Sequence, residues 1–170
     1  MRVLGLPGRD QRTEQWLRQL LGGIDVGEAN VVHYRHWEGG DPNMQEEAQR
    51  LAGQQPELVV AKSMGTLVGT LAFQTGLVRP RLMVLIGVPI AHLPATALEP
   101  LRTVGTNIPT LFIQQTDDVT GKFAKVQEFA AGLACCTTVE VPGSDHQYED
   151  VAQLAAIIRS WITAQIGDGQ

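Results

Sequence analysis

Short apolar runs alternate with amphipathic segments along the chain. The apolar runs have the length of strands and are nearly continuous, which is typical of strands buried on both faces of a parallel sheet. The segments between them place apolar residues at helical intervals, as Trp16, Leu17 and Leu20 do. The pattern predicts strands at residues 2–6, 30–34, 57–62, 81–87, 109–115 and 137–141. It predicts helices at residues 13–21, 43–54, 64–75, 122–133 and 148–166.

This order of elements predicts an α/β domain in which helices cover both faces of a parallel sheet. A length of 170 residues suits one domain with a core between two helical layers. We find no internal repeat, linker or low-complexity segment, so residues 1–170 are expected to form that single domain. Only residues 167–170 have the composition of a frayed tail.

One predicted strand ends in a turn that suits a nucleophile. The run Leu58-Val-Val leads into Ala61-Lys-Ser63-Met-Gly65, and a helical pattern follows. A sharp strand–turn–helix raises a serine hydroxyl above the sheet and aims the N–H groups of the helix N-terminus at it. A serine between small residues is a weak signal alone, since Ser63 can equally be a helix N-terminal residue that satisfies backbone donors.

Two further candidate positions also follow strand ends. Asp117 and Asp118 come after the strand at 109–115, and His146 follows the strand at 137–141. The aspartates can instead cap the next helix, and the histidine can be a surface loop residue. Three suitable residues at three strand ends, in the order Ser, Asp, His, nevertheless favour a catalytic triad.

On these motifs and their order the chain resembles the α/β-hydrolase superfamily, from Val3 to about Ile166. The resemblance implies a minimal, doubly wound form of that fold without a cap domain. Numbered along this chain, its strands would have the order 2-1-3-4-5-6. The order in which strands are added to the sheet would then reverse between strands 1 and 3. Such sheets open a crevice at this point, so Gly8-Arg9 would lie beside Ser63.

The chain departs from the superfamily pattern in its turns. Ala61 stands where the serine motif usually has glycine, and Pro7 precedes Gly8 where most members have histidine. Gln115 occupies the position of a glycine before the triad acid.

Roles follow from chemistry and from the resemblance. Ser63 would attack a carbonyl carbon after His146 takes its proton, and His146 would later protonate the leaving group. Asp118 would orient the imidazole, with Asp117 as the alternative acid. The backbone N–H groups of Met64 and, by resemblance, Arg9 would form the oxyanion hole.

The segment between the fourth and fifth strands suggests the kind of substrate. Relatives often carry a lid at this connection, but residues 88–107 leave room for a short helix and little more. We therefore expect a shallow, open pocket that accepts a small carboxylic ester or thioester rather than a long-chain lipid. The residues expected to line it are Leu6, Ile90 and Leu93, with His92 as a contact at the rim.

No cofactor or metal is signalled. Gly5-Leu-Pro-Gly8 lacks the third glycine of a dinucleotide fingerprint, although its turn leaves an anion-binding module as a minor alternative. His33 and His36 lack partners at zinc-ligand spacing. Lys62, beside the serine, is expected to be solvated or paired.

Composition argues against several classes of partner. The net charge is −5 without a cluster of Lys and Arg, which disfavours nucleic acid. No segment reaches membrane-spanning length, and the first seven residues are too short for a signal peptide. Cys135 and Cys136 are adjacent and expected to be free thiols in a reducing compartment, so we expect a cytoplasmic protein. Oligomeric state is left open.

Two functions of different class are compatible with these features. The first is a small, lidless serine hydrolase, and the second is a non-catalytic protein that binds a ligand or partner on the same scaffold. All three reactive side chains are retained, which favours the hydrolase. One observation separates the two: in a hydrolase His146 reaches both Ser63 and an aspartate, whereas in a binding protein the aspartate is free to turn outward as a helix cap.

Overall fold

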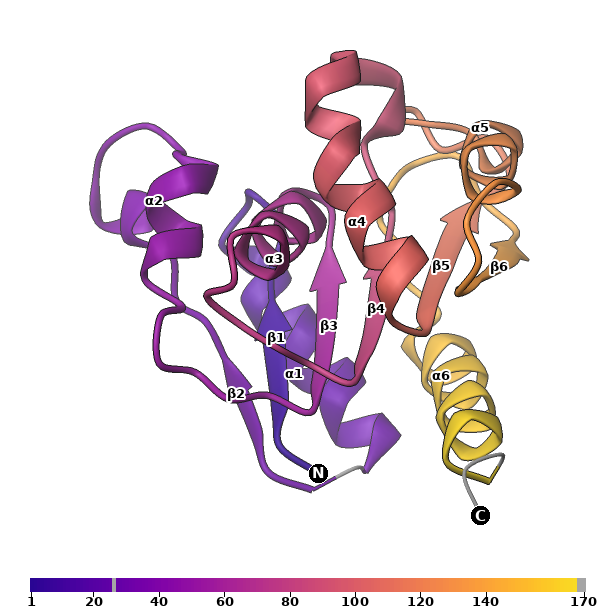
Figure 1. Ribbon diagram of the computed structural model, residues 1–170, viewed down its shortest axis with the longest axis horizontal. Helices are drawn as coiled ribbons and strands as arrows, with labels where there is room; N and C mark the ends of the chain where they lie inside the picture. Colours follow the sequence, from indigo (N-terminus) through magenta and orange to yellow (C-terminus); the bar gives the residue numbers. More distant parts are fainter. Residues whose placement is uncertain (26, 168–170) are drawn as a thin grey trace.

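A six-stranded parallel sheet forms the centre of the computed structural model, which describes residues 1–25 and 27–167. Neighbouring strands follow the order β2-β1-β3-β4-β5-β6 (Figure 1), so the predicted order is confirmed. The strands are β1 (Val3–Leu6), β2 (Ala29–Val31), β3 (Leu58–Lys62), β4 (Leu82–Ile86), β5 (Thr110–Gln115) and β6 (Cys136–Val141).

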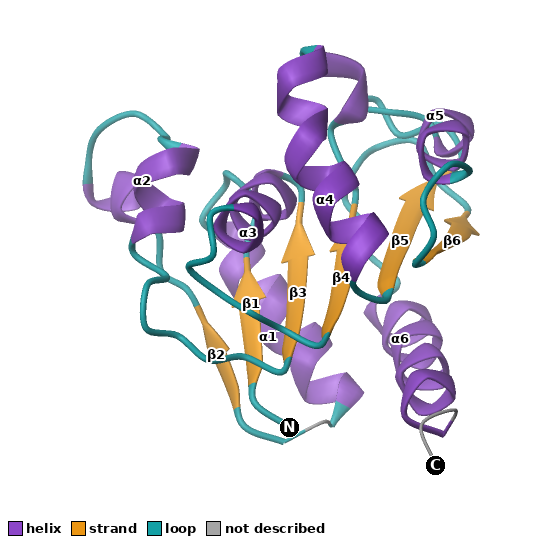
Figure 2. Cartoon of the chain, viewed as in Figure 1, coloured by secondary structure: helices purple, strands orange, loops and turns teal. Residues whose placement is uncertain are grey.

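Helices cover both faces of the sheet (Figures 1 and 2). One face carries a pair of helices that pack against each other, α1 (Arg12–Ile24) and α6 (Val151–Gly167). The other face carries α2 (Met44–Gln49), α3 (Met64–Gln74), α4 (Glu99–Asn107) and α5 (Phe123–Ala130). The chain thus has the three layers expected from the alternation of its apolar runs.

The core is divided in two by the sheet. Successive strand residues point to opposite faces, so Val60 packs with α1 and α6 while Val59 and Ala61 pack with the helices of the other face. All residues of β1, β3, β4 and β5 are buried. Because both faces of these strands are buried, apolar residues occupy successive positions along them instead of alternating with polar residues.

Two elements near the N-terminus are shorter than predicted. The second strand ends at Val31, and the chain turns into a 3₁₀ turn at Arg35–Glu38, because the buried Tyr34 ring packs under the loop after β1. The helix predicted to reach residue 54 ends at Gln49. Asn43 caps this helix, since its side chain accepts hydrogen bonds from the second and third residues of α2.

The C-terminal helix begins three residues later and ends one residue later than the predicted range 148–166. Helix α6 includes Gly167, which the sequence placed in a frayed tail. The remaining residues of that expected tail, 168–170, lie outside the described residues.

The segment between β4 and β5 contains two 3₁₀ turns, Ile90–His92 and Ala95–Leu98, followed by α4. Helix α4 packs on α3, and this segment builds no separate cap domain. The expectation of a short helix and little more is therefore confirmed.

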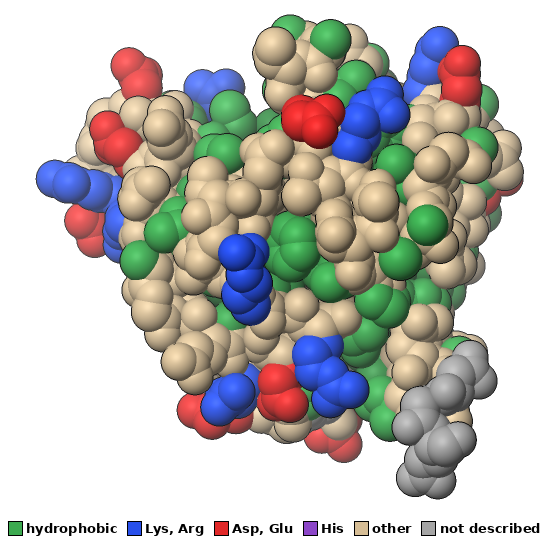
Figure 3. All heavy atoms as spheres, in the orientation of Figure 1, with side chains coloured by type: hydrophobic (Ala, Val, Ile, Leu, Met, Phe, Trp, Pro, Cys, Tyr) green, Lys and Arg blue, Asp and Glu red, His purple; other side chains and the backbone are tan. Residues whose placement is uncertain are grey.

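Charged side chains are dispersed on the face that α3 and α4 cover. Figure 3 shows acidic and basic groups there singly or in mixed pairs. No helix in residues 1–25 and 27–167 combines the length and apolar character needed to cross a membrane.

Candidate active site

Ser63 occupies a strained turn between β3 and α3. Its φ of 51° and ψ of −118° lie in a region that non-glycine residues rarely adopt. The turn is held by the Ser63 N–H, which donates to Ile86 O at 2.9 Å. It also depends on Gly65, because a Cβ there would overlap the carbonyl oxygens of Leu6 and Pro7. The start of α3 therefore lies directly against the loop that follows β1.

His146 joins Ser63 to one of the two candidate acids. Its Nε2 lies 2.9 Å from Ser63 Oγ, and its Nδ1 lies 2.8 Å from Asp118 Oδ2. Asp117, the alternative acid, is exposed and pairs with Lys122 Nζ at 2.8 Å. The loops after β3, β5 and β6 thus bring together Ser63, Asp118 and His146 at the carboxyl edge of the sheet.

Asp118 is buried and surrounded by hydrogen-bond donors. Its Oδ1 accepts from the N–H and the hydroxyl of Thr120, both at 2.8 Å. Its Oδ2 accepts from Tyr148 Oη at 2.7 Å as well as from His146. Burial acts to raise the pKa of this carboxyl, but the donors outweigh burial and lower the pKa to about 2.

The charge on Asp118 sets the tautomer of the histidine. Because Asp118 is ionised at neutral pH, His146 Nδ1 carries the proton and donates it to the carboxylate. His146 Nε2 is then left with a lone pair directed at the Ser63 hydroxyl. The arrangement can take the proton of Ser63 and stabilise the imidazolium that results.

The loop that carries His146 is fixed by side chains from two strands. His146 has a φ of 66°, and its N–H donates to Gln115 Oε1 at 2.8 Å. Its carbonyl accepts from Lys62 Nζ at 2.9 Å. Gln115 Nε2 also donates to Asp145 Oδ1 at 3.1 Å. The residue that replaces the expected glycine at position 115 is therefore the one that holds the histidine loop.

Lys62 is buried, so of the two expected states, solvated or paired, it is not solvated but paired, with the His146 carbonyl as its partner. Its residue surface is 3% exposed, and its ammonium lies over the rings of Trp16 and Tyr148, 5.5 and 5.2 Å from their centroids. Burial lowers the pKa of Lys62 to about 8, opposed by the charges of the nearby aspartates. The side chain packs into the site instead of leaving it, because the His146 carbonyl offers a buried acceptor.

The two residues predicted to supply oxyanion donors, Met64 and Arg9, lie in segments near the serine. Met64 is the first residue of α3, so its N–H has no acceptor within the helix. The Arg9 N–H donates no hydrogen bond within the described part of the chain. Arg9 follows Gly8, where a Cβ would lie 3.4 Å from Ser63 Cβ. Both amides therefore belong to segments in contact with the serine.

A cavity of about 410 Å³ opens beside Ser63 and His146. Its wall is formed by the loop after β1, the start of α1 and the loop after His146. The lining residues are Gly8, Arg9, Asp10, Arg12, Thr13, Trp16, Lys62, Ser63, His146, Gln147 and Glu149.

This lining differs from the expected one. Leu6 is fully buried in the core, where its side chain packs at Gly69 of α3. Ile90 packs against Gly121, and His92 is exposed. None of these residues, nor Leu93, lines the cavity, because the segment 88–93 lies over the turn after β5 rather than over the serine.

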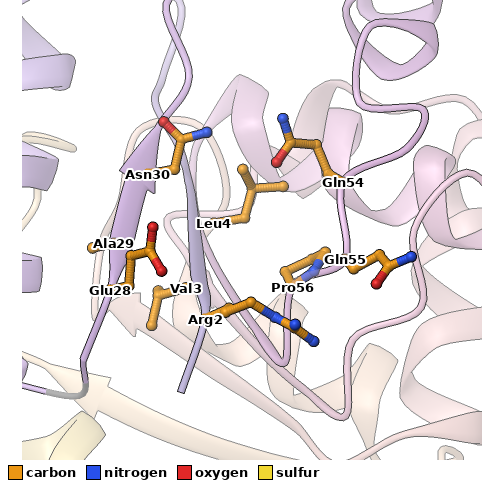
Figure 4. Close-up of a pocket in the computed structure, with 9 residues that line it drawn as sticks. All are labelled: Arg2, Val3, Leu4, Glu28, Ala29, Asn30, Gln54, Gln55 and Pro56. Atoms are coloured by element: carbon orange, nitrogen blue, oxygen red, sulfur yellow. The ribbon is translucent and has the colours of Figure 1, made fainter.

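A second cavity, of about 380 Å³, lies at the opposite end of the sheet (Figure 4). Residues at the start of β1, at the start of β2 and in the segment before β3 line this cavity. Its side chains include Arg2, Glu28 and Asn30 together with Gln54 and Gln55. It contains no serine, cysteine or histidine, so it offers no nucleophile or proton acceptor of the kind found at Ser63.

No group of three or more metal-binding side chains occurs among residues 1–25 and 27–167. His33 instead contacts Glu14 at 2.9 Å, and His36 contacts the Arg9 carbonyl at 3.0 Å. Cys135 and Cys136 are free, partly buried thiols, as expected.

Several site residues were not anticipated. Thr120 and Tyr148 bind the carboxylate, and Trp16 donates through Nε1 to the Tyr148 carbonyl at 3.0 Å. Thr120 has a local signal, since a threonine two positions after an aspartate often donates to it. Tyr148 and Trp16 have none, because their contacts join segments far apart in the chain.

Solved structures share this fold at low sequence identity. A proposed hydrolase of the α/β superfamily from Xanthomonas campestris pv. campestris is 14% identical, with a TM-score of 0.72 over 96% of this chain and 98% of the other. An α/β serine hydrolase homologue from Coxiella burnetii is 13% identical, with a TM-score of 0.68 over 94% of this chain and 83% of the other. A loop variant of a haloalkane dehalogenase from Bradyrhizobium elkanii is 13% identical, with a TM-score of 0.73 over 98% and 90%.

Comparisons with protein-family models and with curated proteins give no match. The structural neighbours include proteins named for different reactions, so the likeness defines the architecture and not the substrate. The order of the strands, the three layers and the near-complete coverage agree with those neighbours. The chain therefore has the α/β-hydrolase fold.

Proposed function

We propose that this protein is a serine hydrolase that cleaves a small carboxylic ester or thioester through an acyl-enzyme. The observation that carries the proposal is the unbroken line of hydrogen-bonding contacts from Ser63 Oγ through His146 to Asp118. A carboxylate, a base in the correct tautomer and a strained nucleophile are the parts that acyl transfer needs.

In the proposed reaction Ser63 Oγ adds to the acyl carbon while its proton passes to His146 Nε2. The electron pair of the carbonyl moves to its oxygen, which the N–H groups of Met64 and Arg9 stabilise. Collapse of this intermediate expels the alcohol or thiol, which receives the proton from His146. Water then repeats the sequence on the acyl-enzyme and releases the acid.

The alternative, a non-catalytic binding protein, is less well supported by the geometry. An aspartate that turned outward to cap a helix would have favoured it. Asp117 does face solvent, but Asp118 is fully committed to the histidine and its own donors. A site kept only for binding has no need of a buried carboxylate that orients an imidazole.

The size of the substrate follows from the open cavity and the absence of a cap domain in the 88–107 connection. A cavity of about 410 Å³ whose lining residues are mostly polar or charged suits a small acyl group better than a fatty chain. The substrate class proposed here is therefore a short-chain ester or thioester.

Labelling with a fluorophosphonate tests the proposal, because such probes modify a serine only when a base and an oxyanion hole activate it. We expect the wild type to be labelled and the Ser63→Ala and His146→Ala variants to remain unlabelled. Thr110→Val is a matched control. It removes a buried hydroxyl that donates to Ile108 O at the amino end of β5, away from the loops that carry the triad, and this variant should be labelled like the wild type.

Hydrolysis of p-nitrophenyl acetate and p-nitrophenyl palmitate by the same proteins tests the substrate class. We expect turnover of the acetate and little of the palmitate. A folded wild type that the probe does not label would refute the hydrolase and favour the binding role. Faster cleavage of the palmitate would refute only the short-chain preference.

A further inference from the structure

Three side chains from one short segment bind the backbone of the loop that follows β1. Tyr34 Oη donates to Pro7 O at 3.0 Å. Trp37 Nε1 donates to Arg9 O at 2.8 Å, and His36 Nε2 lies 3.0 Å from the same oxygen. A carbonyl only accepts hydrogen bonds, so the proton of His36 must be on Nε2 for this contact. We call these three side chains the carbonyl clamp.

The rings of the carbonyl clamp support one another. Tyr34 is fully buried and stacks on His36 with centroids 5.6 Å apart, while Trp37 meets Tyr34 edge-on at 5.1 Å. The buried carboxylate of Glu47 holds the start of the 3₁₀ turn by accepting from Arg35 N at 2.8 Å. The donors are therefore presented from a rigid unit.

His36 contributes in a way that stability alone does not explain. Its Nδ1 is buried and makes no hydrogen bond within residues 1–25 and 27–167. It lies 3.9 Å from Glu47 Oε1. A buried ring nitrogen without a partner costs stability. In return, this placement of the His36 ring gives the Arg9 carbonyl a second hydrogen-bond donor besides Trp37.

We propose that Tyr34, His36 and Trp37 are positioning residues for the oxyanion hole, an inference that rests on the proposed hydrolase function. The N–H expected to bind the oxyanion belongs to the peptide between Gly8 and Arg9. The carbonyl clamp holds the oxygens of the two peptides on either side of it. With both neighbours fixed, the central peptide cannot move away from Ser63 and keeps only rotation about its own axis.

Preorganisation is the physical reason that this matters. An oxyanion donor is effective only if it is in place before charge develops, and a displacement of about 1 Å can cost about 10²-fold in rate. The loop after β1 is exposed from Arg9 onward, so it needs restraint from outside. The carbonyl clamp supplies that restraint without touching the substrate.

A trifluoromethyl ketone tests the oxyanion hole directly. Ser63 Oγ adds to its carbonyl carbon, the proton passes to His146, and the former carbonyl oxygen becomes the anion that the hole binds. The corresponding trifluoromethyl alcohol has a similar shape but cannot form this adduct. Inhibition by the ketone therefore reports on the hole, whereas binding of the alcohol reports on the cavity alone.

Tyr34→Phe and Trp37→Phe remove the donors and keep aromatic rings in place. Relative to the wild type, we expect each variant to lower kcat/KM for p-nitrophenyl acetate about tenfold and to raise the Ki of the ketone by the same factor. The double variant should show about a hundredfold change in both. The Kd of the alcohol and the pH dependence of fluorophosphonate labelling should not change. Thr110→Val is the control for loss of a buried donor elsewhere.

Variants with the kinetics and ketone affinity of Thr110→Val would overturn the positioning role. An equal loss of ketone and alcohol binding would also overturn it, because the rings would then only shape the cavity. Melting temperatures of all variants identify any that are simply unfolded, and the milder single variant is then compared. A wild type that the fluorophosphonate does not label would instead overturn the proposed hydrolase, and this role with it.

Discussion

Non-glycine residues with a positive backbone φ are concentrated in the candidate site. Within the described residues four non-glycine positions have such a φ, and Ser63, His146 and Tyr148 are three of the four. Such conformations cost about 1–3 kcal/mol each and persist only where the surroundings enforce them. Here the enforcement comes from named bonds: Ser63 N–H to Ile86 O, and His146 N–H to the side chain of Gln115. Strain at these residues is therefore a property of the site.

The two neighbouring aspartates give a prediction at this scale. Asp118→Asn should leave the fold intact but lower kcat about 10³–10⁴-fold, because an amide no longer holds His146 with its proton on Nδ1. Asp117→Asn should leave kcat unchanged, since Asp117 pairs with Lys122 at the surface. Steady-state hydrolysis of p-nitrophenyl acetate measures both. A larger loss in the Asp117 variant would reverse the assignment.

At the scale of elements, the close approach of α3 to β1 assembles the oxyanion side of the site. Gly65 allows the helix to start against the backbone of Leu6 and Pro7. The loop that follows then places Gly8 beside Ser63. The same loop receives the carbonyl clamp from the segment after β2. Ser63 and the segments that carry the proposed oxyanion donors are thus brought together by packing between neighbouring elements rather than by one continuous motif.

Gly65→Ala should damage both stability and activity. Its Cβ would meet backbone atoms that have no room to yield, so we expect a loss of about 1–3 kcal/mol in the free energy of unfolding and at least a tenfold loss in kcat. Gly22→Ala is a matched control in the last turn of α1, where a Cβ meets nothing. It should stabilise the protein by about 1 kcal/mol, because alanine favours helix over glycine. Urea unfolding compares the two, and equal behaviour would show that the approach at Gly65 is not tight.

At the scale of the whole molecule, the sheet order brings distant residues together. Strands β3, β4, β5 and β6 are consecutive neighbours, so the loops that carry Ser63, Asp118 and His146 all leave the same edge. Helices on both faces bury the strands and keep their spacing constant. The acid–base pair is therefore coupled to global folding, because its geometry exists only in the folded sheet.

This coupling predicts a pH dependence of stability. The pKa of Asp118 is about 2 in the folded chain and 3.8 ordinarily. Because folding lowers this pKa, the ionised carboxylate stabilises the fold by about 2 kcal/mol at any pH well above the ordinary pKa. That contribution is lost as the pH falls from about 4 through about 2. Urea unfolding of the wild type and of Asp118→Asn across this range measures it. The difference in unfolding free energy between the two should shrink as the pH falls, and a constant difference would contradict the lowered pKa.

Local patterns predicted most of the fold and the central contacts of the site. The apolar runs indicated where each of the six described strands lies, and the chain order of Ser63, an aspartate at 117 or 118, and His146 anticipated which loops meet. Local patterns failed at the second strand and at the pocket. The burial of Tyr34 depends on a loop far away in the sequence, and nothing in the segment 88–93 shows which neighbouring turn it covers.

The sequence by itself determined the elements, their order and the reactive residue types, because these follow from apolar periodicity and from turns that short segments encode. Tertiary structure alone decided that Asp118 and not Asp117 contacts His146, that Lys62 is buried, and that Gln115 holds the histidine loop. It also decided where the cavity opens. Each of these depends on contacts between segments distant in the chain, which form only when the sheet is assembled.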